Sequence, residues 1–439
     1  MIRRLSSAGL VLLTICCSAL HADDRPRIVS VGAVAPDIVG ITVEAGRVTY
    51  GRQEPYIRQN GDVLDRQGKG GNKWLVRNGR QIGAVIGKDA AILRTFDALE
   101  GAPLDTGWAD KPATYSIISP DDPAYRAATK PAAVFRKSKP FDEAQVRDWG
   151  FEFPLVHVVY LKLPAPLVPN RTYSIAFNNG PFSALKFVHQ PESNTSEAVH
   201  VTQIGFRPDD PAKAAFLSCW LGSGGGLSYK EGSTFSVLDH KTGRSVFNGV
   251  IVLSKAAGAG EDPYKRNYNS TDVYIMDFST LNVPGTYRVC VAGIGCSLPF
   301  EIGAEVWRKP FLTSAKSFYF QRSGIELTPP YAGFKRPRCF HPANGVKVYA
   351  SSCALMDSGN GLNARGTDKD NFGNLVAGKT EEIVADAWGG YFDAGDWDRR
   401  IQHLEASRLL LELAEMFPEY MKTAGLNIPE SGNGLPDVV

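Results

Sequence analysis

The chain has 439 residues, of which 43% are hydrophobic and 21% are charged, and its 48 basic and 46 acidic side chains give a formal net charge of +2. This composition is ordinary for a globular protein, and at roughly 150 residues per domain the length predicts two to four domains. The nearly balanced charge, without a basic cluster, excludes nucleic acid as a predicted partner.

The first 22 residues have the pattern of an export signal. Arg3 and Arg4 precede a short apolar core, and cleavage is expected after Ala19 or Ala22. A lipoprotein signal at Cys16-Cys17 is disfavoured because the usual small residue before the cysteine is missing. No later run of about 18 apolar residues follows. We therefore predict an exported protein, periplasmic or secreted, without a membrane span.

Residues 23–189 read as a β-sandwich. β-branched and aromatic runs at 27–31, 41–43, 48–50, 156–163 and 172–177 are separated by turn-forming residues. Long polar insertions are expected between about Gln53 and Asp148. The insertions contain Trp74, Trp108 and Trp149, which we interpret as core residues, with a sugar-binding platform as the alternative.

A polar, turn-rich stretch at 190–198 is predicted to be a linker, and a second β domain follows at 199–303. Its clearest strands are expected at 235–239 and 272–278. Pro284-Gly285 suits the centre of a type II turn, and Pro169-Asn170 repeats that turn in the first domain. Cys290 and Cys296 flank a Gly-Ile-Gly turn, so a hairpin disulfide is predicted.

After Gly303 the spacing of apolar residues becomes helical. Phe311, Ala315 and Tyr319 lie on one face of a first helix, and Leu404, Leu411 and Ala414 do the same in a later one. The stretch between them, 323–386, is rich in glycine and asparagine and is expected to be irregular. Loops of that length inside a compact domain are often functional.

The string from Trp388 to Arg400 combines aspartates, aromatic residues, glycines and arginines. Its two glycines before Tyr391 permit a tight backbone bend. Asp393 and Asp396 lie about one helical turn apart, so both carboxylates can face one side. The aromatic residues offer flat apolar faces on which sugar rings stack. Asp393 could equally be the N-cap of the following helix, and the two interpretations are compatible.

This string resembles the Gly-Gly-aromatic-x-Asp-Ala-Gly-Asp signature of glycoside hydrolase family 9, the inverting cellulases. The segment from Ser431 to Asp437 looks like a second family motif. The resemblance covers roughly residues 199–439. It implies that the second β domain is an Ig-like module that braces the catalytic domain. It also implies that 304–439 are the first, incomplete part of an α/α toroid of six helical hairpins.

The resemblance further implies roles for individual residues. Asp396 corresponds to the general base and Asp393 to the residue that helps to hold the water. Trp388, Tyr391 and Trp397 are candidates for shaping the substrate subsite, with a core role as the alternative for Trp397. Asp398 is expected to be a surface charge or to pair with an arginine.

The general acid is missing from this assignment. Inverting hydrolysis needs a second, protonated carboxyl group, which the family supplies from a glutamate far downstream. The acidic residues nearer at hand match no family motif and are not assigned: Glu405, Glu412, Glu415, Glu419 and Glu430. The expected function is hydrolysis of β-1,4 bonds in cellulose or related β-glucans. We expect apolar faces of the residual helices to be exposed, and the chain alone to be inactive.

No cofactor is required by this reading. Some family members hold zinc through cysteine and histidine, but here Ser323 stands at a ligand position and Phe340 separates Cys339 from His341, which argues against that site. A Cys339–Cys353 disulfide is predicted instead. Family members often carry calcium, yet 368–371 fails the EF-hand pattern, so no calcium ligand is assigned.

Two alternatives remain open. One is an exo-acting glucosaminidase of the same family, because endo- and exo-acting members share the aspartate motif. The other is a non-catalytic glycan-binding or scaffold protein made of two β-sandwiches with a vestigial helical tail. In each case the expected partner is a β-glucan polysaccharide or a related oligosaccharide, and the sequence indicates no oligomeric state.

Overall fold

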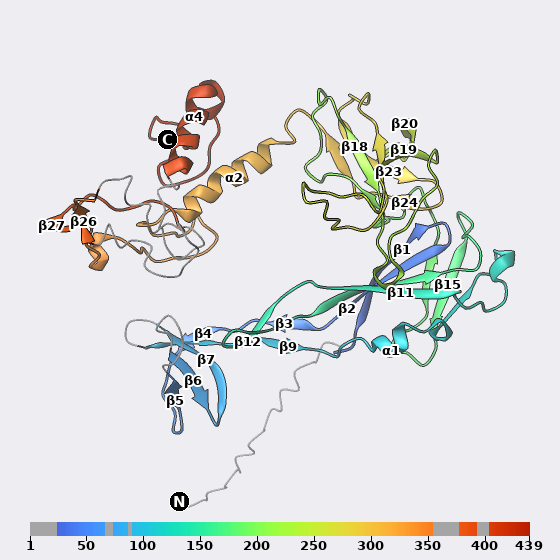
Figure 1. The fold of residues 1–439 in the computed structure, drawn as a ribbon, viewed down its shortest axis with the longest axis horizontal. Coiled ribbons are helices and arrows are strands. Elements are labelled where there is room, and N and C mark those ends of the chain that lie inside the picture. Colours follow the sequence, from blue (N-terminus) through green and yellow to red (C-terminus); the bar gives the residue numbers. More distant parts are fainter. Residues whose placement is uncertain (1–23, 66–72, 87–89, 354–376, 393–403) are drawn as a thin grey trace, which may run out of the picture. The chain divides into compact units, whose positions relative to one another are not determined.

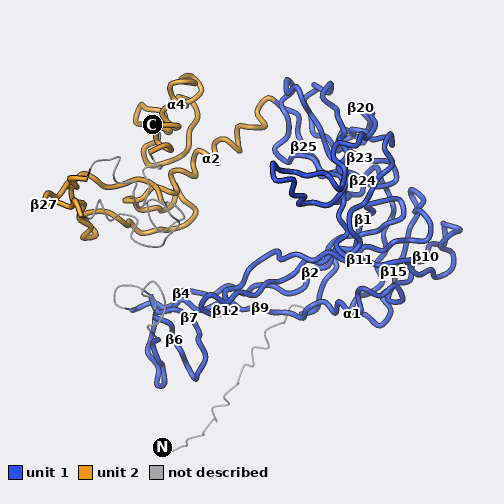
Figure 2. The backbone as a smooth tube through the Cα atoms, in the orientation of Figure 1, with its two compact units in different colours: residues 1–303 blue, residues 304–439 orange. Residues whose placement is uncertain are grey.

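The computed structural model describes residues 24–65, 73–86, 90–353, 377–392 and 404–439 (Figure 1). The chain divides into two units, residues 1–303 and 304–439 (Figure 2). The described part of the first unit is built mainly of strands. The longer helices lie in the second unit. The predicted N-terminal β domains are confirmed, whereas the α/α toroid stays a prediction. The export signal at 1–22 lies outside the described residues.

The first sandwich consists of two antiparallel sheets. One sheet has the order β1-β2-β14-β11 and the other the order β10-β15-β16. Most of the strands expected from sequence are found, and the register of β2 on β14 runs without interruption from Ile38 to Ala45. The strands are β1 (Arg27–Ala35), β2 (Ile38–Ala45), β14 (Leu155–Lys162), β11 (Ala133–Pro140), β10 (Tyr115–Ile118), β15 (Thr172–Phe177) and β16 (Leu185–Val188).

The polar insertions fold into further small sheets. A five-stranded sheet has the order β4-β8-β7-β6-β5, and two strand pairs, β3-β9 and β12-β13, accompany it. A short helix, α1 (Thr106–Ala109), follows β9. The strands are β3 (Arg47–Thr49), β4 (Gln53–Pro55), β5 (Val63–Asp65), β6 (Lys73–Arg77), β7 (Arg80–Ile86), β8 (Ile92–Thr95), β9 (Ala98–Glu100), β12 (Ala144–Arg147) and β13 (Gly150–Glu152).

The Ig-like domain is a second sandwich. Its sheets are β17-β18-β22-β21 and β20-β19-β23-β24, with β25 paired to β23. The strands are β17 (Val199–His200), β18 (Ala214–Leu217), β19 (Thr234–Asp239), β20 (Ser245–Val250), β21 (Val252–Lys255), β22 (Val273–Asp277), β23 (Gly285–Val291), β24 (Gly295–Cys296) and β25 (Phe300–Ile302).

Strand β14 is buried on both faces. Val159 and Leu161 belong to the core of the first sandwich, whereas the alternate residues Val158 and Tyr160 belong to the core of the Ig-like domain. Successive side chains of a strand point to opposite faces, so one strand serves both cores. The continuous apolar run of β14 therefore reflects burial on two sides.

Polar contacts reinforce this joint. The Tyr160 hydroxyl donates to the Glu197 carboxylate, and the Ser196 hydroxyl donates to the Ala33 carbonyl at 2.6 Å. The Tyr229 hydroxyl donates to the Val34 carbonyl at 2.8 Å. Ser196 and Glu197 lie in the stretch predicted as a linker, so that stretch is anchored to both sandwiches. A buried hydroxyl without such a partner would cost free energy.

The glycine-rich turn at 222–226 lies against β11 of the first sandwich. A Cβ atom at Gly224 would stand 2.6 Å from the Phe135 ring, which only glycine avoids. The Arg136 amide donates to the Ser223 hydroxyl at 3.1 Å across the same contact. The glycines thus permit close approach of two domains.

The three tryptophans of the insertions lie in different parts of the first unit. Trp74 is buried and stacks on Phe96 at 5.3 Å. The Trp108 indole N–H donates to the Asn178 carbonyl at 2.9 Å, and its ring packs against Tyr115. Trp149 is 81% exposed. The core interpretation is confirmed for Trp74, fits the packing of Trp108 and is wrong for Trp149, which sits at a hairpin tip.

The predicted disulfide joins Cys290 to Cys296. The Pro-Asn turn is also found, since Asn170 has φ +61°. The type II turn predicted at Pro284-Gly285 is wrong, because Gly285 does not take the positive φ that this turn requires. Instead Gly285 begins β23, where it pairs with Ile302 of β25.

The second unit packs α2 (Arg308–Gln321) against the C-terminal segment. Its core includes Ala315 and Tyr319 of α2 with Met421, Leu426 and Ile428. The remaining elements are α4 (Leu404–Met416), α5 (Pro418–Met421) and the strand pair β26 (Tyr349–Ser351) and β27 (Lys379–Ile383). The two helices expected from the sequence are both found among the described residues, as α2 and α4.

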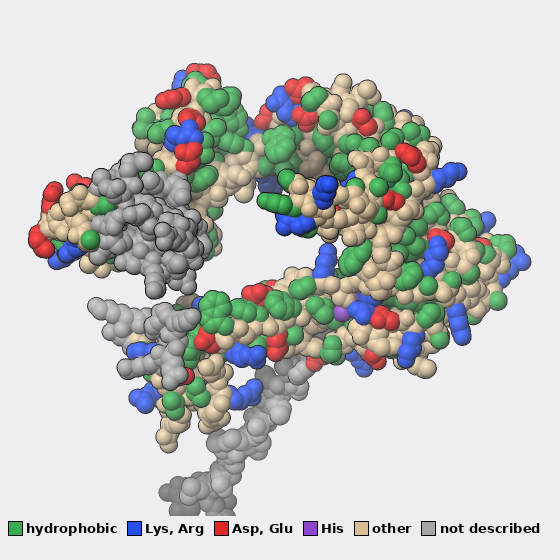
Figure 3. All heavy atoms as spheres, viewed as in Figure 1, with side chains coloured by type: hydrophobic (Ala, Val, Ile, Leu, Met, Phe, Trp, Pro, Cys, Tyr) green, Lys and Arg blue, Asp and Glu red, His purple; other side chains and the backbone are tan. Residues whose placement is uncertain are grey.

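Helix α4 leaves several apolar side chains at the surface. None of its residues is fully buried, and hydrophobic side chains are visible over it in Figure 3. The exposed ones are Leu404, Leu409, Leu411 and Met416. The expected exposure of apolar helical faces is therefore found. Within the described ranges, no helix is long and apolar enough to cross a membrane.

The shared core predicts that Tyr160 stabilises both sandwiches at once. We expect Tyr160→Ala to lower the free energy of unfolding of the first unit by about 3–5 kcal/mol, because the side chain is fully buried and leaves a cavity. Urea denaturation followed by circular dichroism measures the loss. Tyr264→Ala, at a residue that is 79% exposed, is the control and should cost less than about 1 kcal/mol. Equal effects of the two variants would contradict the shared core.

Two buried histidines predict a loss of stability in mild acid. Burial lowers the pKa of His157, aided by the Arg136 charge, and burial lowers the pKa of His189. Below pH of about 6.5 the unfolded chain binds protons that the folded chain does not, so stability is complete above that pH and falls below it. Denaturation at pH 7.5 and 5.5 should show a drop that is smaller in the variant carrying His157→Gln and His189→Gln. An identical drop would rule out the histidines as its cause.

Candidate functional site

The predicted site residues belong to the second unit, and the structure describes two of them. Trp388 and Tyr391 are described, whereas Asp393, Asp396 and Trp397 lie outside the described residues. Their roles therefore stay predictions. The structure does show how the chain leads into them, from Trp388 to Phe392.

The glycine bend predicted before Tyr391 is present. Gly389 has φ +96° and Gly390 has φ +114°, in a region that other residues rarely adopt. Two backbone hydrogen bonds then hold this segment, in which Tyr391 forms an isolated β-bridge with Arg322. The Ser323 amide donates to the Gly390 carbonyl at 2.8 Å, and the Phe392 amide donates to the Gln321 carbonyl at 2.7 Å. The residues before Asp393 are thus held against the C-terminal end of α2.

Trp388 packs in a notch beside Gly324. A Cβ atom at Gly324 would stand 2.6 Å from the indole ring, and Gly324 itself has φ +78°. The His341 ring meets Trp388 edge to face, with centroids 4.3 Å apart. Trp388 remains 45% exposed. It is therefore a packed ring that solvent can reach.

Tyr391 and Phe392 have different surroundings. Tyr391 meets Phe318 of α2 edge to face at 6.0 Å and lines a cleft. Phe392 is buried, and the Arg336 guanidinium lies 4.6 Å from its ring centroid. The Arg336 guanidinium also donates to the Phe320 and Arg322 carbonyls at the end of α2. Phe392 is thus the buried residue that holds this segment in place, and Tyr391 lies at the cleft.

The cleft has a volume of about 330 Å³ and lies wholly within the second unit. Residues from α2, from the strand containing Tyr391 and from the second motif line it. From the second motif these are Asn433, Leu435, Pro436 and Asp437. The two segments quoted for the family resemblance therefore border one cavity, although about forty residues of sequence separate them.

Asp437 holds the loop of the second motif together. One of its carboxylate oxygens accepts from the Leu426 amide at 2.7 Å and from the Ser431 hydroxyl at 2.6 Å. Gly432 and Gly434 both have positive φ, +86° and +92°, which lets the loop turn back on itself. Asp437 is therefore a residue that organises the wall of the cleft.

Charged side chains at the cleft are paired. Arg322 and Glu430 form a salt bridge of 3.0 Å beside Tyr391. Burial raises the pKa of the neighbouring Tyr319, and the Glu430 charge adds to that effect. Sequence reasoning left Glu430 unassigned and gave Arg322 no role at the site. Nothing in the local sequence signals their pairing, because 108 positions separate them.

The other acidic residues weighed as acids lie elsewhere. Glu405 and Glu412 both pair with Arg408 along α4, and that arginine lowers the pKa of Glu405. Glu419 pairs with Lys422 at 2.8 Å. These are helix-surface ion pairs, so the decision to assign none of them a catalytic role fits the structure.

The predicted Cys339–Cys353 disulfide is wrong. The two thiols are not bonded, and the Cys339 thiol instead contacts the Pro337 carbonyl at 3.3 Å. Cys339 belongs to the segment that pairs with Gly324, whereas Cys353 follows β26, so different backbone pairings hold them.

The described residues also offer no metal cage. His341 accepts from the Ala343 amide through Nδ1, and the described ranges contain no group of three or more histidine, cysteine, aspartate or glutamate side chains placed for a metal. His403 and the 368–371 stretch considered for calcium lie outside the described residues.

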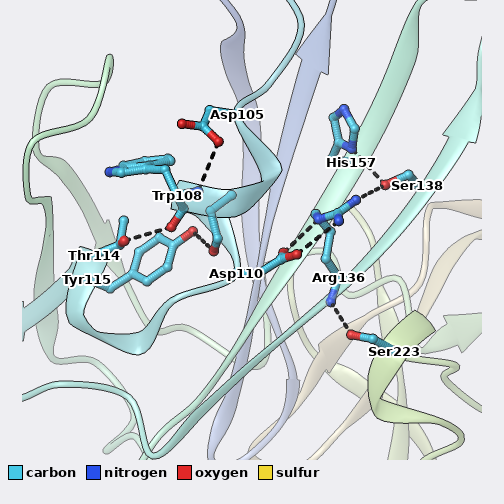
Figure 4. A network of polar contacts seen from close by, with 10 residues as sticks. Asp105, Trp108, Asp110, Thr114, Tyr115, Arg136, Ser138, His157 and Ser223 are labelled. Carbon is cyan, nitrogen blue, oxygen red and sulfur yellow. Dashed lines mark hydrogen bonds and ion pairs between the residues drawn. The ribbon is translucent and has the colours of Figure 1, made fainter.

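A polar network in the first unit contains the residue types of a nucleophilic triad, but its hydrogen-bond partners are different (Figure 4). The Arg136 guanidinium donates to both Asp110 oxygens and also to the Ser138 hydroxyl at 2.6 Å. The Ser138 hydroxyl lies 2.7 Å from His157 Nδ1. In a Ser-His-Asp triad the carboxylate orients the imidazole. Here the carboxylate binds an arginine, so the network is structural.

Comparisons with known proteins agree on one family of enzymes. Residues 194–296 match the family described as the cellulase N-terminal ig-like domain. Endoglucanase D of Acetivibrio thermocellus is 26% identical over 241 residues, which cover 54% of this chain and 30% of the relative. The xyloglucan-specific endo-beta-1,4-glucanase BoGH9A of Bacteroides ovatus is 26% identical over 245 residues, 56% of this chain and 34% of the relative.

A third relative extends over the first sandwich as well. Endoglucanase C of Cellulomonas fimi is 23% identical over 414 residues, which cover 89% of this chain and 32% of the relative. The chain thus spans about a third of the length of the curated relatives it matches. The resemblance to family 9 cellulases read from the sequence is confirmed.

The packing of Trp388 on Gly324 yields a prediction. Gly324→Ala should displace the indole and lower the stability of the second unit by about 1–3 kcal/mol, because the residue has a positive φ and the new methyl group would meet the ring. Thermal unfolding and tryptophan fluorescence measure both effects.

Gly333→Ala is the matched control for this prediction. Its new methyl group would have nothing within 4 Å, and its φ is not in the positive range, so the change should be nearly neutral. If the two alanine variants behaved alike, Trp388 would not be seated as described.

Proposed function

We propose that this chain takes part in the hydrolysis of β-1,4 bonds in cellulose or a related β-glucan. Its similarity to endoglucanases supports the reaction class. The observation that carries the proposal is the cleft bordered by Tyr391 of the first motif and by Asn433 to Asp437 of the second. Tyr391 and Phe318 give this cleft aromatic side chains, on which a sugar ring can stack.

Inverting hydrolysis requires an ionised carboxylate and a water on one side of the sugar, and a protonated carboxyl group about 6.5–9.5 Å away. In the proposal Asp396 is the base and Asp393 helps to hold the water. Arg399 and Arg400 follow in sequence and would favour the charged form of Asp396. Trp388 and Tyr391 would orient the ring, with Trp397 as a further candidate.

The general acid is the part that the described cleft does not supply. Glu430 is engaged by Arg322, and Asp437 accepts two hydrogen bonds that hold its own loop. Neither is placed as a free proton donor. We infer that catalysis needs a glutamate from a complete catalytic domain. The exposed leucines of α4 are then a surface for further helices to cover.

A non-catalytic, glycan-binding role is the second candidate. The engagement of Glu430 by Arg322 and of Asp437 by its own loop favours it, because binding needs rings and hydrogen bonds but no proton donor. The two candidates differ in what they predict for turnover. An exo-acting glucosaminidase would differ from both in its substrate.

The test replaces Asp396 in a protein that carries this chain together with a complete family 9 catalytic domain. Asp396→Asn should lower kcat on soluble cellulose by about 10²–10⁴-fold while folding and binding persist, because general-base catalysis contributes a factor of that order. Reducing-sugar release measures kcat. Asp398→Asn, two residues on, is the control and should retain activity within a few-fold.

The 439-residue chain gives the complementary measurement. We expect it to release no sugar, because the described residues of the cleft include no free proton donor. Unchanged turnover in Asp396→Asn would end the base assignment. Robust release by the 439-residue chain would show instead that its own residues supply the acid. Release of glucosamine from a glucosamine oligomer, with no sugar released from soluble cellulose, would favour the exo-acting alternative.

A further inference from the structure

Trp149 stands at the tip of the β12–β13 hairpin in a conformation that folding does not explain. Its φ is +51°, a region in which a bulky residue is an outlier and in which turns usually place glycine or asparagine. It is also 81% exposed, so its indole gains little from packing. Asparagine or glycine would make the same turn at lower cost. The presence of tryptophan therefore points to a use outside the fold.

The hairpin that carries Trp149 is firmly mounted. One oxygen of the Asp97 carboxylate accepts from the Gly51 amide and the other from the Gln145 amide, both at 2.8 Å. The Asp97 amide donates back to the Gln145 carbonyl at 3.0 Å. Two hydrogen bonds thus tie Gln145 of β12 to Asp97, and the third ties Asp97 to Gly51. An exposed ring on a fixed hairpin is already ordered, which lowers the entropy lost on binding.

Further exposed aromatic residues accompany Trp149 along the same hairpin. Phe151, Phe153 and Phe141 are each exposed by about two-fifths or more. Phe151 lies opposite Gln145 in the β12–β13 ladder, and the Phe141 amide donates to the Pro154 carbonyl at 3.2 Å where the hairpin joins β11 and β14. Tyr50 adds a fifth exposed ring, held by its hydroxyl to Asp142. Several flat faces therefore follow one structural element.

The charged side chains of the hairpin indicate which class of ligand it can bind. From Asp142, two residues before β12, to Glu152 at the end of β13, the segment has one base, Arg147, and four carboxylates, Asp142, Glu143, Asp148 and Glu152. Such a surface repels anionic membranes and nucleic acids. Carboxylates also accept hydrogen bonds from hydroxyl groups, which an uncharged sugar polymer presents in number.

We propose that this hairpin is a glucan-binding site in which Trp149 stacks on a pyranose ring of a β-linked chain. It uses residues of the first unit and none of the cleft described above. The choice of a β-glucan as ligand rests on the proposed function. The site would keep the chain on its polysaccharide whether or not a bond is cut, because it contributes no reacting group.

The test measures binding rather than hydrolysis. The 439-residue chain is run through native gels that contain hydroxyethylcellulose or xyloglucan, and its retardation gives an affinity. Trp149→Asn should bind about tenfold or more weakly, as expected when a stacking ring is lost. Its melting temperature should not fall, because asparagine tolerates the positive φ. Phe151→Ser, which leaves the turn intact, should weaken binding in the same direction.

Two controls separate this site from other sources of binding. Tyr264→Ala removes an equally exposed ring from the Ig-like domain and should leave retardation unchanged. Tyr391→Ala removes a ring from the cleft, and the loss caused by Trp149→Asn should persist in that background.

Three results would overturn the proposal. The first is wild-type retardation of Trp149→Asn. The second is a lower melting temperature of that variant, which would make Trp149 structural. The third is Trp149-dependent binding to phosphatidylcholine–phosphatidylserine vesicles without binding to either glucan. A failure of Asp396→Asn to reduce hydrolysis would leave this binding result untouched.

Discussion

The first unit depends on a sheet that is buried on both faces. Strand β14 sends Val159 and Leu161 into one core and Val158 and Tyr160 into another. A linker between two separate sandwiches would allow them to move independently, but a shared strand does not. The hydroxyl of Tyr160 and the carboxylate of Glu197 then tie the connecting segment to the same place. The fixed relation of the two β domains follows from this one strand.

In the first unit, the alternating side chains of a strand determine the packing. In the second unit, glycine residues determine where the chain bends. Gly389 and Gly390 turn the chain, and Gly324 leaves room for Trp388. These glycines let the backbone pass close to an aromatic ring, and the ring stays accessible to solvent. Phe392, buried under Arg336, anchors the strand from the other side. The segment that leads into the aspartates is therefore positioned by backbone geometry and by aromatic contacts.

Aromatic residues have different roles in this chain. Trp74 is buried in β6 and Trp108 of α1 packs against the core of the first sandwich, whereas Trp149 and Trp388 present a ring to solvent. The difference matters because a buried ring stabilises the fold and an exposed, ordered ring is available to a ligand. Charge adds a further distinction. The cleft holds a salt bridge between Arg322 and Glu430, while the β12–β13 hairpin carries an excess of carboxylates.

The sequence by itself determined the β character of the first three hundred residues, the helices after Gly303, the Cys290–Cys296 bond and the resemblance to family 9. These features depend on local periodicity, short loops or contiguous motifs, which are readable along the chain. Tertiary structure alone decided that β14 serves two cores and that Trp149 is exposed. It also decided that Cys339 and Cys353 do not bond and that Arg322 meets Glu430. Each depends on how residues far apart in sequence are brought together, because burial, pairing and register belong to the packed chain and not to any one of its segments.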